Sequence, residues 1–103
     1  MSALDRLAAT IAARRGADPA TSWTARLLAD PDKAAEKFGE EAVEAVIEAV
    51  RADPAKLTSE AADALYHLLV MCAARGVTLA DIEAELTRRE SRSGLEEKAA
   101  RRR

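Results

Sequence analysis

Apolar residues recur at helical spacing along most of the chain. Near the start, Leu4, Leu7 and Ile11 fall on one face of a helix, and the same spacing returns from Leu79 to Leu86. Residues that favour strands are sparse, with eight Val and Ile and three aromatic side chains in the whole sequence. The pattern therefore predicts an all-α fold of four to five helices.

Local signals place the helix ends. Ser2 and Thr78 are each followed three residues later by Asp, the arrangement of a capping box. Asp30-Pro31 and Asp53-Pro54 each combine a capping side chain with proline at the first helical position. Ser22 is a further capping residue, and we expect Trp23, Leu27 and Leu28 to face inward from the short helix that it begins. Predicted helices thus begin after Ser2, Ser22, Asp30, Asp53 and Thr78, and end near Arg15, Leu28, Arg51, Arg75 and Glu90.

Composition indicates a small domain with a thin core. Half of the 50 hydrophobic residues among the 103 are alanine, which buries little area. We expect one all-α domain over residues 1–90 and a basic C-terminal tail over residues 91–103. Because so little apolar area is available inside one chain, we also expect the bundle to be completed by a second copy in a homodimer.

Several classes of protein are excluded. The longest apolar run, Leu68 to Ala74, is far shorter than a membrane span, and Asp5 and Arg6 interrupt any early signal peptide. The single Cys72 cannot form an internal disulfide. Negative charge concentrates in residues 31–63, with nine acidic against four basic residues, so a nucleic-acid partner is not expected. We predict a cytoplasmic protein without a membrane partner.

One acidic stripe lies on the helix predicted after Asp30. At 100° per residue, its members fall within an arc of roughly 100°; they are Lys37, Glu40, Glu41, Glu44 and Glu48. Glutamates four residues apart repel each other, and this stripe has a single cation. A stripe that only solubilises a helix usually alternates in sign. This one is better explained by a bound cation.

A second acidic stripe, formed by Glu60, Asp63 and His67, interrupts the most apolar helix of the chain. A helix that is apolar on nearly every side is a buried helix, and a buried carboxylate needs a partner. The two stripes contain the motif E-E-x-x-E (Glu40 to Glu44) and, after fifteen further residues, the motif E-x-x-D (Glu60 to Asp63). Two facing helices with these motifs could present carboxylates to one or two Mg²⁺ ions. His67 is interpreted as a hydrogen-bonded core residue, with a metal-ligand role as the alternative.

At this point the sequence resembles a known family. K-F-G-E-E-A-V-E-A-V-I-E-A (residues 37–49), E-A-A-D-A-L-Y-H-L-L-V (60–70), S-G-L-E-E-K-A-A-R (93–101) and S-W-T-A-R-L-L (22–28) are similar to phosphoribosyl-ATP pyrophosphohydrolases. These enzymes belong to the MazG-like all-α nucleotide pyrophosphohydrolase superfamily. The acidic motif is shared across the superfamily, whereas Y-H-L-L-V and S-G-x-x-E-K-A indicate this member.

The resemblance implies Mg²⁺-dependent hydrolysis of phosphoribosyl-ATP, a small-molecule nucleotide, to phosphoribosyl-AMP and pyrophosphate in a dimeric enzyme of histidine biosynthesis. The family motif makes metal ligands of four residues: Glu41, Glu44, Glu60 and Asp63. The expected catalytic set consists of Glu40, Glu41 and Glu44. In this set Glu40 would support a ligand or orient the attacking water. Which carboxylate acts as a base stays open.

Basic residues are the candidates for substrate phosphate. Lys37 contacts a phosphate or pairs with a neighbouring glutamate, while Lys98 and Arg101 reach the substrate or belong to a solvated end. Two other functions stay open for the whole chain. One is a housekeeping nucleoside triphosphate pyrophosphatase of the same superfamily, and the other is a helical dimerisation module without catalysis.

Overall fold

The computed structural model describes residues 1–90, Gly94 and Arg101. Within residues 1–90 the chain forms five helices and no strand, which confirms the all-α prediction. The helices are α1 (Ala3–Arg14), α2 (Trp23–Leu28), α3 (Pro31–Arg51), α4 (Pro54–Ala74) and α5 (Leu79–Arg89). Gly94 and Arg101 are exposed and helical, and the rest of the predicted tail, with Lys98, lies outside the described residues.

The helices begin where the capping signals predict. The Ser2 and Thr78 side chains each accept a hydrogen bond from the backbone N–H three residues on, and each box is closed by its Asp carboxylate. The Asp30 and Asp53 carboxylates cap α3 and α4 ahead of proline. These contacts are local, so the sequence alone predicts them.

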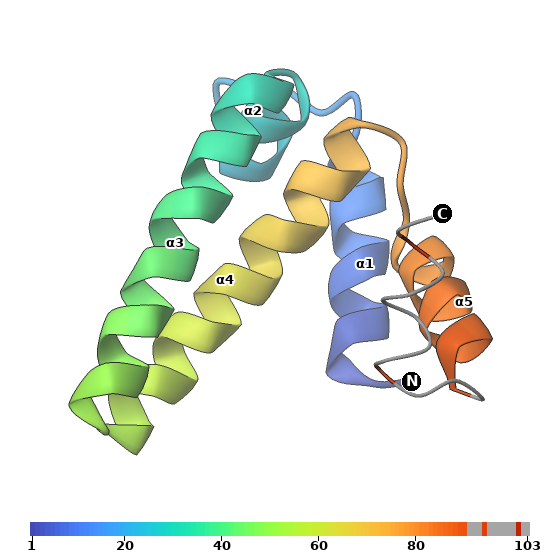
Figure 1. The fold of residues 1–103 in the computed structure, drawn as a ribbon. Coiled ribbons are helices and arrows are strands. Elements are labelled where there is room, and N and C mark those ends of the chain that lie inside the picture. Colours follow the sequence, from blue (N-terminus) through green and yellow to red (C-terminus); the bar gives the residue numbers. More distant parts are fainter. Residues whose placement is uncertain (91–93, 95–100, 102–103) are drawn as a thin grey trace.

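A very short connection turns α3 back onto α4. Ala52 ends α3 in the left-handed conformation, with φ of 59°, and Asp53 then caps α4. The two long helices lie side by side as an antiparallel pair, and α4 also contacts α1 and α2 (Figure 1). The hairpin therefore determines which residues of α3 lie opposite which residues of α4.

The core lies where α1, α2, the start of α3 and the second half of α4 meet. Its buried members are Ile11, Leu27, Leu28, Ala34, Leu69 and Val70. The guanidinium group of Arg15 donates a hydrogen bond to the Ala73 carbonyl oxygen, which ties the end of α1 to the end of α4.

The sequence predicted that Trp23 faces inward, and this prediction is wrong. The residue is 43% exposed, and the Arg26 guanidinium lies 5.9 Å from its ring centroid. Leu27 and Leu28, one turn later, fill the core instead. In its place the neighbouring Thr24 connects α2 to α4, because its Oγ1 lies 2.5 Å from the Tyr66 hydroxyl.

The apolar side of α3 is open to solvent within one chain. Val43, Val46, Ile47 and Val50 recur at helical spacing and are all exposed. The side of α3 that packs against α4 carries Glu41 and the buried Glu48 instead. A single chain thus turns polar groups inward and an apolar stripe outward, which reverses the usual arrangement of an amphipathic helix.

Among the described helices, none alone is long and apolar enough to cross a membrane. Within the part of the chain that the structure describes, one pair of helices, α4 and α5, reaches the required length and hydropathy together, and the pair is bent by 104° at the break.

Candidate functional site

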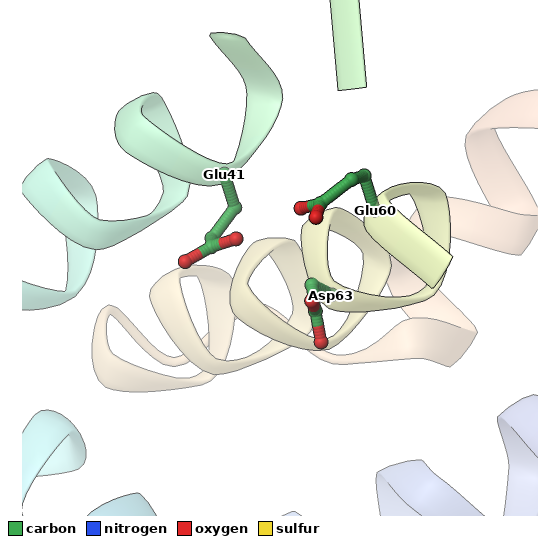
Figure 2. Close-up of side chains that lie close together, drawn as sticks. All are labelled: Glu41, Glu60 and Asp63. Atoms are coloured by element: carbon green, nitrogen blue, oxygen red, sulfur yellow. The ribbon is translucent and has the colours of Figure 1, made fainter. Parts of the chain in front are cut away.

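Three carboxylates meet between the two long helices. Glu41 comes from α3, and Glu60 and Asp63 come from consecutive turns of α4 (Figure 2). One oxygen from each side chain lies within 4.8 Å of the other two. The i, i+3 spacing on α4 and the hairpin between the helices produce this arrangement. Three oxygens so close together form a donor set of the kind that a hard divalent cation prefers.

Glu60 is the member of this group whose pKa is raised from its ordinary value of 4.5. Burial is the largest cause, because removal from water disfavours the charged form. The remaining causes are the nearby negative charges of Asp63, Glu44, Glu41 and Glu48. The site therefore concentrates more negative charge than the protein itself neutralises, which favours a cation there.

Lys37 and Glu40 form an ion pair at the neighbouring turn of α3. The Lys37 Nζ donates to a Glu40 carboxylate oxygen at 3.0 Å. This hydrogen bond and the opposite charges raise the pKa of Lys37 and lower the pKa of Glu40. The ion-pair interpretation of Lys37 is thus the arrangement observed here. An ammonium group carries three hydrogens, so the same side chain keeps donors for a phosphate.

Two further glutamates of the stripe differ in their environment. Glu44 is exposed and stands outside the group of three, although its charge acts on Glu60. Glu48 is only 8% exposed, and its Oε1 lies 3.8 Å from Arg51 Nη1 without a hydrogen bond. Glu48 was predicted to lie on the acidic stripe but not among the site residues. Of the basic candidates in the tail, Arg101 is exposed and Lys98 is not described.

Comparison with known proteins assigns the chain to a family. Residues 4–90 match the model of the family described as phosphoribosyl-ATP pyrophosphohydrolase. The chain belongs to this family. The phosphoribosyl-ATP pyrophosphohydrolase match includes all five described helices except the first residue of α1, and it contains both acidic motifs.

Individual relatives are similar over nearly their full length. The phosphoribosyl-ATP pyrophosphatase of Paracoccus denitrificans is 76% identical over 99 residues, covering 95% of this chain and 92% of the relative. The protein of the same name from Cereibacter sphaeroides is 72% identical over 102 residues, covering 98% and 99%. That from Ruegeria pomeroyi is 67% identical and covers 98% and 97%. This phosphoribosyl-ATP pyrophosphohydrolase family member thus spans essentially the whole length of these relatives.

Proposed function

We propose that this protein hydrolyses phosphoribosyl-ATP to phosphoribosyl-AMP and pyrophosphate, the second step of histidine biosynthesis. The 76% identity to a phosphoribosyl-ATP pyrophosphatase across 95% of the chain carries this proposal. The convergence of Glu41, Glu60 and Asp63 supports it independently, because a polyphosphate can approach an acidic site only through cations that bridge the two.

We propose Mg²⁺ as the cation. Glu41, Glu60 and Asp63 would hold it, and the exposed Glu44 would join them from the next turn of α3. Their hard oxygen donors and the raised pKa of Glu60 fit a divalent ion. When bound, such an ion polarises a phosphoryl group and makes its bound water more acidic. The surrounding residues supply orientation, which is the main contribution of a protein to phosphoryl transfer.

Lys37 and Glu40 would complete the catalytic set. Lys37 is fixed beside the carboxylates by its bond to Glu40, so its remaining hydrogens can meet a phosphate oxygen. Glu40 is exposed on the same stripe, where it would support a ligand or orient the attacking water. Arg101 and Lys98 remain proposed contacts for substrate phosphate.

We also propose that the enzyme is a homodimer in which α3 lies at the interface. Val43, Val46, Ile47 and Val50 are exposed and follow one another at helical spacing on one face of α3, and an exposed apolar face of this kind marks an interaction site. A second copy of the same stripe would cover it, since two-fold interfaces are self-complementary. We also propose that the enzyme acts in the cytoplasm, in keeping with its similarity to phosphoribosyl-ATP pyrophosphatases.

A turnover panel tests the proposed activity. Purified protein is given phosphoribosyl-ATP, the canonical dNTPs and damaged dNTPs in separate reactions with Mg²⁺, and released pyrophosphate is measured. We expect kcat/KM to be highest for phosphoribosyl-ATP. A preference for a dNTP would indicate a housekeeping pyrophosphatase, and no release from any substrate would indicate a dimerisation module.

A further inference from the structure

His67 is the single histidine of the chain and lies on α4 one turn after Asp63. The residue is only 8% exposed. Its Nδ1 lies 2.9 Å from the Asp63 carbonyl oxygen. Because a carbonyl oxygen only accepts hydrogen bonds, Nδ1 carries the hydrogen and donates it. In the neutral ring Nε2 then carries only its lone pair.

The orientation of this ring is held from several sides. The Tyr66 ring packs edge-on against the imidazole, with 4.8 Å between the ring centroids and 84° between the planes. The Tyr66 hydroxyl is in turn hydrogen-bonded to Thr24 of α2. These contacts, with the bond to Asp63, keep Nε2 pointing in one direction. A hydrogen bond from one imidazole nitrogen to a backbone carbonyl fixes the tautomer and the direction of the other nitrogen.

Nε2 itself is buried and has no hydrogen-bond partner within the described part of the chain. Leaving a buried acceptor unpaired is unfavourable, so such an atom in a native structure usually meets a water or a ligand. His67 continues the stripe of Glu60 and Asp63. The unpaired nitrogen therefore belongs to a residue that lies on the stripe of the carboxylate site, one turn after Asp63.

We propose that His67 is a positioning residue whose Nε2 accepts a hydrogen bond from a water molecule on the divalent cation held by the carboxylates. The inference rests on the proposed metal-dependent function. Mg²⁺ prefers oxygen ligands and keeps several waters, so a neutral imidazole is better suited to accept from such a water than to bind the ion.

Nuclear magnetic resonance tests this directly, because a single histidine needs no assignment. In protein labelled with ¹⁵N at the imidazole, we expect Nδ1 to carry the hydrogen before any ion is added. Addition of Mg²⁺ with inorganic pyrophosphate should then shift the Nε2 resonance and leave the Nδ1 hydrogen in place. An Nε2 resonance that does not move while Mg²⁺ binding is saturated, or a hydrogen found on Nε2 instead, overturns the proposal.

Two substitutions separate this role from a structural one. His67→Gln places an amide near the position of Nε2, whereas His67→Asn places one near Nδ1 and can keep the bond to the Asp63 carbonyl. We expect the Asn variant to lose about 10- to 100-fold in Mg²⁺ affinity or kcat, with KM for the nucleotide little changed, and the Gln variant to retain most of both. Equal values for the two variants, or a better Asn variant, would overturn the assignment.

The outcome is independent of substrate identity. The titration uses Mg²⁺ and inorganic pyrophosphate, so a protein that rejects phosphoribosyl-ATP still gives a readable response at His67. Conversely, turnover of phosphoribosyl-ATP with an unresponsive Nε2 removes the role of His67 and leaves the proposed function standing. If neither variant folds, as judged by circular dichroism, the resonance of the wild-type protein decides alone.

Discussion

The exposed apolar stripe of α3 leads to a quantitative prediction for Val46→Asp. Val46 is 61% exposed in the single chain. Complete burial of a valine side chain is worth about 1.5–3 kcal/mol, so covering the exposed fraction stabilises each subunit by about 1–2 kcal/mol. A two-fold interface counts this twice, which gives about 2–4 kcal/mol for the dimer. The loss corresponds to a dimer dissociation constant raised about 30-fold to nearly 10³-fold.

The assay is sedimentation velocity over a concentration series, with the wild-type protein and the variant compared at equal salt. We expect the wild-type protein to sediment as a dimer and Val46→Asp to shift to monomer over the concentrations at which the wild type stays dimeric. Circular dichroism should show helical content unchanged, because position 46 already faces solvent in the single chain.

Leu86→Asp is the matched control. The exposed fraction of Leu86, 58%, is similar to that of Val46. Leu86 lies on α5, however, away from α3. We expect this substitution to leave the dimer intact. A wild-type protein that is monomeric at every concentration, or equal dissociation constants for wild type and Val46→Asp, would refute an interface on α3. Dissociation by Leu86→Asp alone would move the interface to α5.

Further predictions concern the site, the pH dependence of stability and the helix itself. Asp63→Asn should lower kcat/KM by about 10²-fold or more and abolish the rise in melting temperature that Mg²⁺ gives the wild type. Glu36→Gln, at an exposed position of α3, should change neither quantity. Turnover by Asp63→Asn at the wild-type rate would contradict the ligand assignment. Without metal, the raised pKa of Glu60 means that its folded state binds the proton more readily, so stability should rise as pH falls through that pKa towards 4.5, and Glu60→Gln should remove this rise in melting scans. Arg88 and Arg89 lower the pKa of Glu85 to about 2, so the stability that the charged Glu85 contributes should be complete above pH 4.5 and lost between pH 4.5 and 2. The melting temperature of Glu85→Gln should therefore fall less steeply than that of the wild type as pH is lowered over that window. An unchanged slope would refute the pairing. Gly39→Ala should stabilise the protein by about 1 kcal/mol in urea unfolding, because Gly39 is in mid-helix and an added Cβ would have nothing within 4 Å. A lower urea midpoint for the variant would show that a partner or ligand approaches this position.

The ends of the helices were predictable because their signals are local. Asp30-Pro31 and Asp53-Pro54 each act within one turn, and α3 and α4 begin where those pairs indicate. The orientation of Trp23 was not predictable in the same way. Helical periodicity states which residues share a face, but not whether a side chain in the first turn reaches the core or lies over the helix end beside Arg26.

The site was predictable as a pair of motifs but not as a geometry. The i, i+3 spacing predicts that Glu60 and Asp63 share a face, and they do converge with Glu41. The same rule places Glu44 with Glu41, yet Glu44 is exposed and stands outside the group. The rotation of α3 about its own axis decides this difference. That rotation also buries Glu48 and exposes the valines, and it depends on contacts that no single helix encodes.

The two-residue connection between α3 and α4 has a consequence for how the protein folds. Glu41, Glu60 and Asp63 all belong to one hairpin of neighbouring helices. Glu41 is 19 residues from Glu60 and 22 from Asp63, whereas 58 residues separate Arg15 of the α1 end from Ala73. Contacts of smaller sequence separation cost less loop-closure entropy, so we expect the hairpin to close before α1 docks. The carboxylates would then come together while the chain is still folding, and their mutual repulsion would oppose closure of the hairpin. A cation that binds them would act on the folding rate as well as on the finished enzyme.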